Sequence, residues 1–358
     1  MRQVDARKLL GWYAKHKRDL PWRRSTDPYA VLVSEIMLQQ TTVAAVVPKY
    51  ESWMKVFPTP EELASATAEQ VMSQWSGLGY YQRARRLHSC VKEVCERGGF
   101  PTTLNGLLEL PGLGPYTAAA VASICFERPA LAIDTNVMRV LYRYYALSYE
   151  PGDRQADSVL RDETRSILDW ADPGDFNQAL MELGASLCSV KEPGCLLCPM
   201  STGCQGRKSE AGPTSFPLKK TKKRPVVTPG KLLLLEREKA GSVLLVRGTS
   251  LGLLSELYQP PMIFPVDLSP PSPLAVLGEE IFRRGSSESF EFNYGISGRK
   301  LTLEVGLWRM DEDESERNEL FLSKAGLRPR WYQRGESDEN PPLSSLTRKA
   351  LRRWEESL

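Results

Sequence analysis

Apolar residues recur at helical spacing through most of residues 1–204, and the alternation typical of strands is nearly absent there. Residues suited to begin helices fit this pattern: Asp27, Thr59, Asp134 or Thr135, and Asp175. Seven segments show the helical pattern: 27–57, 59–75, 80–98, 115–126, 135–147, 154–171 and 175–188. We therefore predict a mostly helical first domain over residues 1–204.

The pattern changes after residue 204. Residues 205–230 are polar, with four prolines and seven basic residues against one acidic residue, and we predict an extended linker. Residues 231–358 contain strand-like runs that predict two hairpins, one turning at residues 239–241 and one at 297–298. A closing helix over 343–358 places its apolar residues on one face. These features predict an α+β second domain.

Composition narrows the class of protein. The chain has 358 residues, of which 41% are hydrophobic and 25% charged, as in ordinary soluble proteins. We find no apolar run of membrane-spanning length and no secretory leader, so we expect a cytoplasmic protein without a membrane role. The net charge of +3 does not by itself indicate nucleic acid, but basic residues cluster at 80–88 and 207–225.

Four of the seven cysteines lie within seventeen residues, in the pattern C-x6-C-x2-C-x5-C: Cys188, Cys195, Cys198 and Cys204. Such crowding in a cytoplasmic chain indicates a metal site more than disulfides. Thiolates suit both zinc and iron–sulfur clusters, and the spacing alone leaves these two open.

The stretch LPGLGPYTAAAVAS, residues 110–123, predicts two helices joined by a tight turn with Gly112 and Gly114. A plain helix–helix turn is one interpretation. The other, which the pattern favours, is a helix–hairpin–helix whose free backbone N–H groups bind a DNA phosphate.

Two carboxylates suggest chemistry on a glycosidic bond. Glu35 lies within the apolar run VLVSEIML, where burial would keep it protonated. Asp134 directly precedes a predicted helix, and a simple helix cap would explain it. Together, however, a protonated and an ionised carboxyl group are the usual pair for glycosidic cleavage.

These features resemble the endonuclease III superfamily of DNA glycosylases and, within it, the MutY family of adenine DNA glycosylases. The resemblance rests on the hairpin, the cysteine loop and four further stretches: LPWR (20–23), SEIMLQQT (34–41), GLGYYQRARRLH (77–88) and NQALMELGA (177–185). It implies a monomeric base-excision repair enzyme of the bacterial cytoplasm, acting on the nucleoid. Its substrate would be duplex DNA with adenine opposite 8-oxoguanine or guanine. It also implies that the four cysteines hold a [4Fe-4S] cluster.

The resemblance assigns roles around the reaction. Glu35 would be the general acid that protonates adenine, Asp134 would stabilise the sugar cation, and Asn136 would support that site. Tyr116 replaces the Schiff-base lysine of bifunctional relatives, which implies a monofunctional glycosylase.

Further matched positions would contact the flipped base and the DNA. The adenine pocket would include Trp22, Arg23 and Glu182. Gln40 and Tyr80 would enter the duplex, and Thr41 and Leu78 would contact 8-oxoguanine.

The chain departs from the family pattern in two places. Thr135 replaces a glycine between the catalytic Asp and the Asn. The second domain weakly resembles the family's Nudix-like lesion-recognition domain, without a Nudix box, so we expect no pyrophosphatase activity. The family's Phe-Ser-His loop aligns with 296–298, where only Ser297 is kept. We therefore expect intact adenine excision with weaker discrimination of the lesion.

Three alternatives remain. A G:T mismatch thymine glycosylase on the same scaffold is disfavoured by LPWR and Glu182. A non-catalytic DNA-binding protein is disfavoured because both carboxylates are present. A bifunctional glycosylase–lyase is disfavoured by Tyr116.

Overall fold

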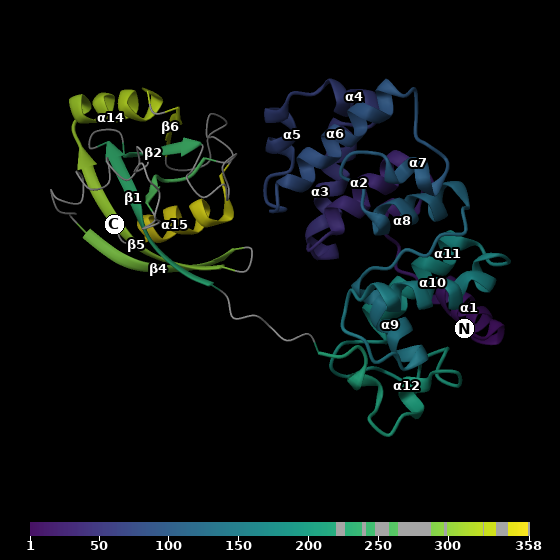
Figure 1. Ribbon diagram of the computed structural model, residues 1–358. Coiled ribbons are helices and arrows are strands. Elements are labelled where there is room, and N and C mark those ends of the chain that lie inside the picture. The colour runs from purple at the N-terminus through teal and green to yellow at the C-terminus, as the bar shows by residue number, and fades with distance from the viewer. Residues whose placement is uncertain are drawn as a thin grey trace. The chain divides into compact units, whose positions relative to one another are not determined.

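The computed structural model describes residues 1–219, 226–237, 241–247, 258–263, 288–296, 299–324, 326–333 and 343–356. The chain divides into two compact units, Met1–Lys222 and Lys223–Leu358, each with its own hydrophobic core (Figure 1). Among the described residues, no helix is long and apolar enough to cross a membrane.

The first unit is helical, as predicted. Its elements are α1 (Gln3–His16), η1 (Pro21–Arg23), α2 (Pro28–Leu38), α3 (Val43–Val56), α4 (Pro60–Ser65), α5 (Ala68–Gln74), α6 (Gln82–Glu96), α7 (Leu104–Leu108), α8 (Pro115–Phe126), α9 (Thr135–Tyr145), α10 (Arg154–Leu168), α11 (Pro173–Ser186), α12 (Gln205–Lys208) and η2 (Pro213–Ser215).

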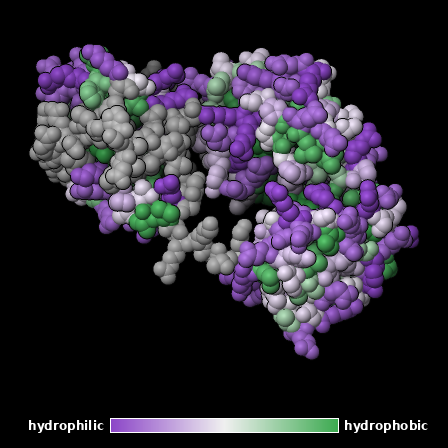
Figure 2. Space-filling view, in the orientation of Figure 1, coloured by the Kyte–Doolittle hydropathy of each residue, from purple (hydrophilic) through white to green (hydrophobic). Residues whose placement is uncertain are grey.

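Two hydrophobic cores support this unit. Helices α2 to α8 surround one, and α1 with α9, α10 and α11 surrounds the other. On the face in Figure 2, hydrophobic residues of this unit form small separate groups among hydrophilic ones. Most large apolar side chains of this unit are buried in the two cores.

Three predicted helix boundaries are wrong. The run 27–57 is two helices, because Gln40 adopts a left-handed backbone conformation (φ 57°) between α2 and α3. The run 59–75 is also two helices, because Thr67 and Gln70 form a capping box that begins α5. Helix α11 begins at Pro173 rather than near Asp175, because Asp172 caps it by accepting a hydrogen bond from the Asp175 backbone.

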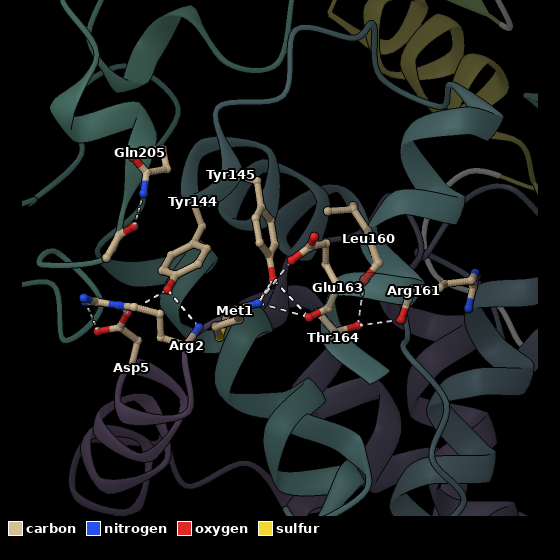
Figure 3. Close-up of polar contacts among 11 residues, drawn as sticks. Met1, Arg2, Asp5, Tyr144, Tyr145, Leu160, Arg161, Glu163, Thr164 and Gln205 are labelled. Carbon is tan, nitrogen blue, oxygen red and sulfur yellow. Dashed lines mark hydrogen bonds and ion pairs between the residues drawn. The ribbon is translucent and has the colours of Figure 1, made fainter. Parts of the chain in front are cut away.

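Polar contacts fasten α1 to the second core (Figure 3). Asp5 is fully buried and accepts hydrogen bonds from the Tyr144 hydroxyl at 2.6 Å and from Arg2 Nε at 2.7 Å. The Met1 amino group donates to the Tyr145 hydroxyl and to the Glu163 carbonyl. These contacts join the start of the chain to α9 and α10.

The predicted linker of residues 205–230 is wrong at both ends. Its first part packs on the helical unit: Phe216 is buried in the second core, and its carbonyl accepts a hydrogen bond from Arg143 Nε at 3.2 Å. The Leu218 backbone N–H donates to the Tyr149 carbonyl at 3.0 Å. Its last part is already strand β1, which begins at Val226. The burial of Phe216 thus holds the first part of this segment on the helical unit, although its polar composition predicts a free linker.

The second unit contains a mixed six-stranded sheet in the order β4-β5-β1-β2-β6, with β3 also paired to β1. Its elements are β1 (Val226–Arg237), β2 (Ser242–Arg247), β3 (Met262–Ile263), β4 (Glu288–Ile296), β5 (Arg299–Met310), α14 (Glu312–Lys324), β6 (Arg328–Tyr332) and α15 (Ser345–Glu355).

Both predicted hairpins are confirmed: β1 pairs with β2 and β4 with β5, each antiparallel. Alternate residues of β1 face opposite sides of the sheet. Leu232 and Leu234 pack with Trp354 of α15, whereas Leu233 and Leu235 pack with Leu322 of α14. The fold is therefore α+β as predicted, although α14 was not foreseen.

Candidate active site

The helical unit contains a cavity of about 700 Å³, formed by η1, α2, the loop after α2, α8, α9 and α11. Side chains far apart in sequence meet here. Eight of the predicted site residues line it: Trp22, Arg23, Glu35, Gln40, Thr41, Tyr116, Asp134 and Asn136.

Glu35 reaches this cavity from α2, whose other buried residues are mostly apolar. Asp27 caps the helix and Pro28 begins it, so Glu35 lies two turns inside an ordered helix. Its side chain is only 6% exposed. The pKa of Glu35 is raised to about 7. Burial is the main cause and the charge of Asp134 adds to it, whereas the Tyr116 hydrogen bond and the charge of Arg23 partly oppose the shift.

Tyr116 lies at the start of α8 and donates a hydrogen bond from its hydroxyl to Glu35 Oε2. Burial beside Glu35 raises the pKa of Tyr116, so this hydroxyl keeps its proton and acts as a donor. Tyr116 is thus in direct contact with the predicted acid.

Asp134 caps α9 and at the same time faces the cavity. Its Oδ1 accepts from the Val137 backbone N–H at 2.6 Å, and its Oδ2 accepts from Asn136 Nδ2 at 2.8 Å. Burial raises the pKa of Asp134, but these two hydrogen bonds and the charge of Arg139 oppose the shift. The charged form of Asp134 therefore has more direct support than that of Glu35.

The side chain of Asn136 is in turn hydrogen-bonded by Arg139. Arg139 Nη2 donates to Asn136 Oδ1 at 2.9 Å and to the Gly184 carbonyl of α11 at 2.7 Å. Arg139 Nε donates to the carbonyl of Cys188 at 2.9 Å, which connects this side of the cavity to the cysteine loop.

In the predicted base pocket, a buried carboxylate pairs with two arginines. Glu182 is 2% exposed and pairs with Arg18 Nε at 2.6 Å and with Arg23 Nη2 at 2.7 Å. Burial would raise the pKa of Glu182, but the hydrogen bonds from Arg18 and Arg23 outweigh it, and the net shift is downward. Trp22 packs edge-on against Tyr50, with ring centroids 5.4 Å apart. Glu182 thus meets the cavity through Arg18 and Arg23, which line it.

The residues predicted to enter DNA lie on two loops. Gln40 follows α2, and Tyr80 precedes α6 with its side chain 58% exposed. Leu78 is buried, at 6% exposure, and does not line the cavity. Ser297 lies outside the described residues.

The predicted helix–hairpin–helix is formed by α7 and α8, which contact each other. Gly112 has φ +81°, and a Cβ there would lie 2.7 Å from Arg86 Cβ, so the turn requires glycine. Gly114 precedes Pro115, the first residue of α8, and no side chain caps this helix.

The four predicted cysteine ligands line one small pocket together with Arg143 and Arg207. Arg143 Nη1 lies 3.3 Å from Cys188 Sγ and donates to the Ser189 carbonyl at 2.6 Å. In the described part of the chain, no three His, Cys, Asp or Glu side chains converge closely enough to hold a metal ion. The thiols therefore surround a pocket without meeting at one point.

Three arginines that bond to predicted site residues or to their neighbours were not predicted from the sequence: Arg18, Arg83 and Arg139. Arg83 and its acceptors lie within or beside quoted motifs, but a motif does not show that a basic residue is buried. Only the folded structure shows which partners these arginines have.

Comparison with known proteins agrees with this geometry. Residues 33–165 match the model of the HhH-GPD superfamily of base excision DNA repair proteins. A human adenine DNA glycosylase is 46% identical over 211 residues, which are 56% of this chain and 39% of that protein. An adenine DNA glycosylase of Mycobacterium tuberculosis is 38% identical over 222 residues, 60% of this chain and 72% of that protein.

The solved structure of a thermostable thymine-DNA glycosylase aligns with a TM-score of 0.52 and 30% identity, over 56% of this chain and 94% of the other. This chain spans about two fifths of the length of the human relative. It nevertheless covers 72% of the mycobacterial relative. The chain therefore belongs to the HhH-GPD superfamily and, within it, to the family of the adenine DNA glycosylases.

Proposed function

We propose that this protein is a DNA glycosylase that removes adenine mispaired with 8-oxoguanine or guanine. The observation that supports this most is the pair of buried carboxyl groups lining one cavity. Glu35 has a pKa near 7, and the charge of Asp134 is stabilised by hydrogen bonds from Val137 and Asn136 and by Arg139. Two carboxyl groups in such different surroundings suit an acid and an ionised partner.

The reaction follows from these surroundings. The adenine nucleotide rotates out of the duplex into the cavity, beside Trp22 and Arg23. Glu35 donates its proton to the base while the N-glycosidic bond breaks. Both bonding electrons leave with adenine, and the cation that forms at the sugar is stabilised by Asp134. Water then adds to the sugar and releases a proton, which leaves an abasic site.

Tyr116 would set which oxygen of Glu35 acts. Because its hydroxyl donates to Oε2, that oxygen serves as the acceptor, and the acidic proton resides on Oε1. A tyrosine forms no imine with the sugar, so we propose a monofunctional glycosylase.

The partner is double-stranded DNA. The left-handed Gln40 and the exposed Tyr80 would enter the duplex, and Thr41 and Leu78 would contact the base opposite adenine. The turn of α7 and α8, with Gly112 and Gly114, would bind a phosphate through backbone N–H groups. The second unit would be a Nudix-like lesion reader, to which Ser297 would contribute.

The cysteine loop is suited to a [4Fe-4S] cluster. Each thiolate of such a cluster binds a different iron, so four thiols around a pocket fit it better than a single ion. Cys188, Cys195, Cys198 and Cys204 would hold the cluster, which would order the loop whose Cys188 carbonyl anchors Arg139.

The test is single-turnover adenine release from two duplexes that differ only in carrying 8-oxoguanine or guanine opposite adenine. We expect release from both, and Glu35→Gln should abolish it while keeping DNA binding. Glu109→Gln is a matched control, because Glu109 is exposed and pairs only loosely with Arg97 at 3.3 Å. Near-normal release by Glu35→Gln would refute the assignment of the acid.

A second candidate is a thymine glycosylase for G:T mismatches, which the similar thymine-DNA glycosylase structure favours. The same assay with a G:T duplex separates the two functions. Thymine release without adenine release would select this alternative. The ion pairs of buried Glu182 with Arg18 and Arg23 beside the cavity are where the two pockets would have to differ.

A further inference from the structure

Arg83 is a buried cation beside the predicted DNA-contact loops and is absent from the mechanism above. It belongs to the first turn of α6 and is 7% exposed. In the described part of the chain its hydrogen-bond acceptors are all neutral oxygens, five backbone carbonyls and one hydroxyl. Burial lowers the pKa of Arg83 to about 10. A buried cation without a carboxylate partner is costly, so a specific task would explain it.

One nitrogen of Arg83 caps the helix that carries Glu35. Nη1 donates to the carbonyls of Ile36 at 2.9 Å and Met37 at 2.8 Å, and also to the carbonyl of Gln39. These belong to the last turn of α2 and the residue after it, where carbonyls lack partners within the helix. The positive charge also suits the negative end of the helix dipole.

The other terminal nitrogen reaches both DNA-contact loops. Nη2 donates to Thr41 Oγ1 at 3.0 Å in the loop after α2. It also donates to the carbonyls of Leu78 at 3.0 Å and Gly79 at 3.2 Å, in the loop before α6. A single planar group thereby joins two segments that are about forty residues apart in the chain.

Both loops contain a non-glycine residue in the left-handed region, Gln40 at φ 57° and Tyr80 at φ 47°. Such a conformation is unfavourable for a residue with a side chain and persists only where neighbouring contacts enforce it. Arg83 contacts both residues that flank Gln40 and both that precede Tyr80. Its guanidinium also lies over the Tyr80 ring, 5.7 Å from the centroid.

We propose that Arg83 is a positioning residue that locks the loops at residues 39–41 and 78–80 into one unit, so that Gln40 and Tyr80 meet a mispair together. This inference rests on the proposed DNA glycosylase function. Lysine would not replace Arg83, because an ammonium group has three donors around one atom and cannot span both loops.

The main test uses the full-length Arg83→Lys variant and non-cleavable duplexes whose target adenosine carries a 2′-fluorine. We compare two Kd values: one for the duplex with 8-oxoguanine opposite the target adenine, and one for the same duplex with thymine opposite that adenine. We expect the preference for the mispair to fall about ten-fold, since several charge-assisted hydrogen bonds are lost. Reduced folding would weaken binding to both duplexes by the same factor and leave the ratio unchanged.

Arg97→Lys is the matched control. Arg97 follows the last residue of the same helix, is exposed and pairs with Glu93 at 2.7 Å, so its substitution should leave the ratio unchanged. An unchanged ratio in folded Arg83→Lys would overturn the inference.

Hydrogen exchange in the free full-length protein tests the coupling independently, even if Arg83→Lys does not fold. Thr41→Val removes one acceptor of Arg83 in the first loop only. The Thr41 amide donates to the Leu38 carbonyl at the end of α2, and the Leu78 amide donates to the Trp75 carbonyl just after α5, so each amide reports on its own loop. We expect the exchange of the Leu78 amide to accelerate several-fold in Thr41→Val. Acceleration confined to residues 39–42 would overturn the coupling.

The two proposals fail in different ways. Absence of adenine release by the unmodified chain would reject the proposed function. Adenine release together with an unchanged binding ratio in Arg83→Lys would reject only the role of Arg83.

Discussion

Glu35 has opposite effects on function and stability. Its raised pKa makes it protonated enough to act as an acid near neutral pH, but above that pH a charge is forced into an apolar helix. The folded state binds the proton more tightly than the unfolded chain, whose glutamate has its ordinary pKa of about 4.5. The contribution of Glu35 to the free energy of unfolding is therefore fully present below about pH 4.5. It is lost as the pH rises through about 7.

We predict that Glu35→Gln stabilises the protein at pH 8. The variant removes the buried charge and keeps an acceptor for the Tyr116 hydroxyl. The gain in the free energy of unfolding should be at most about 3 kcal/mol at pH 8 and near zero at pH 4.5. Urea unfolding of both proteins at the two pH values measures it. An equal difference at both pH values would show that Glu35 does not titrate as described.

The junction of α9 and α11 depends on the absence of a side chain. A Cβ on Gly184 would lie 2.7 Å from Asn136 Cβ and 3.0 Å from the Asn136 carbonyl oxygen. Neither atom can move without moving α9, whose first turn holds Asp134 and Asn136 in place. Close helix packing thus sets the position of the carboxylate.

We predict that Gly184→Ala slows adenine release at least about ten-fold and lowers the free energy of unfolding by about 1–3 kcal/mol. The added methyl group would force α9 and α11 apart. Gly11→Ala is the matched control: Gly11 is also inside a helix but has open space around its Cβ position, so alanine should stabilise it slightly. Thermal unfolding and single-turnover release measure both effects. Normal release by Gly184→Ala would contradict this role of the helix contact.

The division into two units places all the predicted chemistry in the first. The cavity, the hairpin and the cysteine loop lie within residues 1–222, which have two hydrophobic cores of their own. The second unit has a separate sheet and its own helices.

We therefore predict that a chain ending at residue 222 folds and still releases adenine opposite guanine at a rate close to that of the full chain. Circular dichroism and single-turnover release test this. A cut at residue 204, the boundary expected from composition, should be less stable, because it removes Phe216 from the second core. An unfolded 1–222 chain would mean that the first unit needs the second.

Local patterns in the sequence were sufficient for much of the fold. Helical spacing identified the first unit, and short turns between apolar runs identified the two hairpins. The motifs around Glu35, Tyr116 and Asp134 named residues that do line one cavity. These predictions succeed because periodicity, caps and turns act between residues close together in the chain.

Other features came only from tertiary structure. The break at Gln40, the packing of Phe216 and the burial of Arg83 each depend on contacts with distant segments. The Tyr116 hydroxyl that bonds to Glu35 is 81 residues away in sequence. A polar group's burial, partners and pKa are set by whichever segments surround it in the folded chain. The sequence therefore named the candidate reacting residues, and the packing of distant helices decided their surroundings and their position.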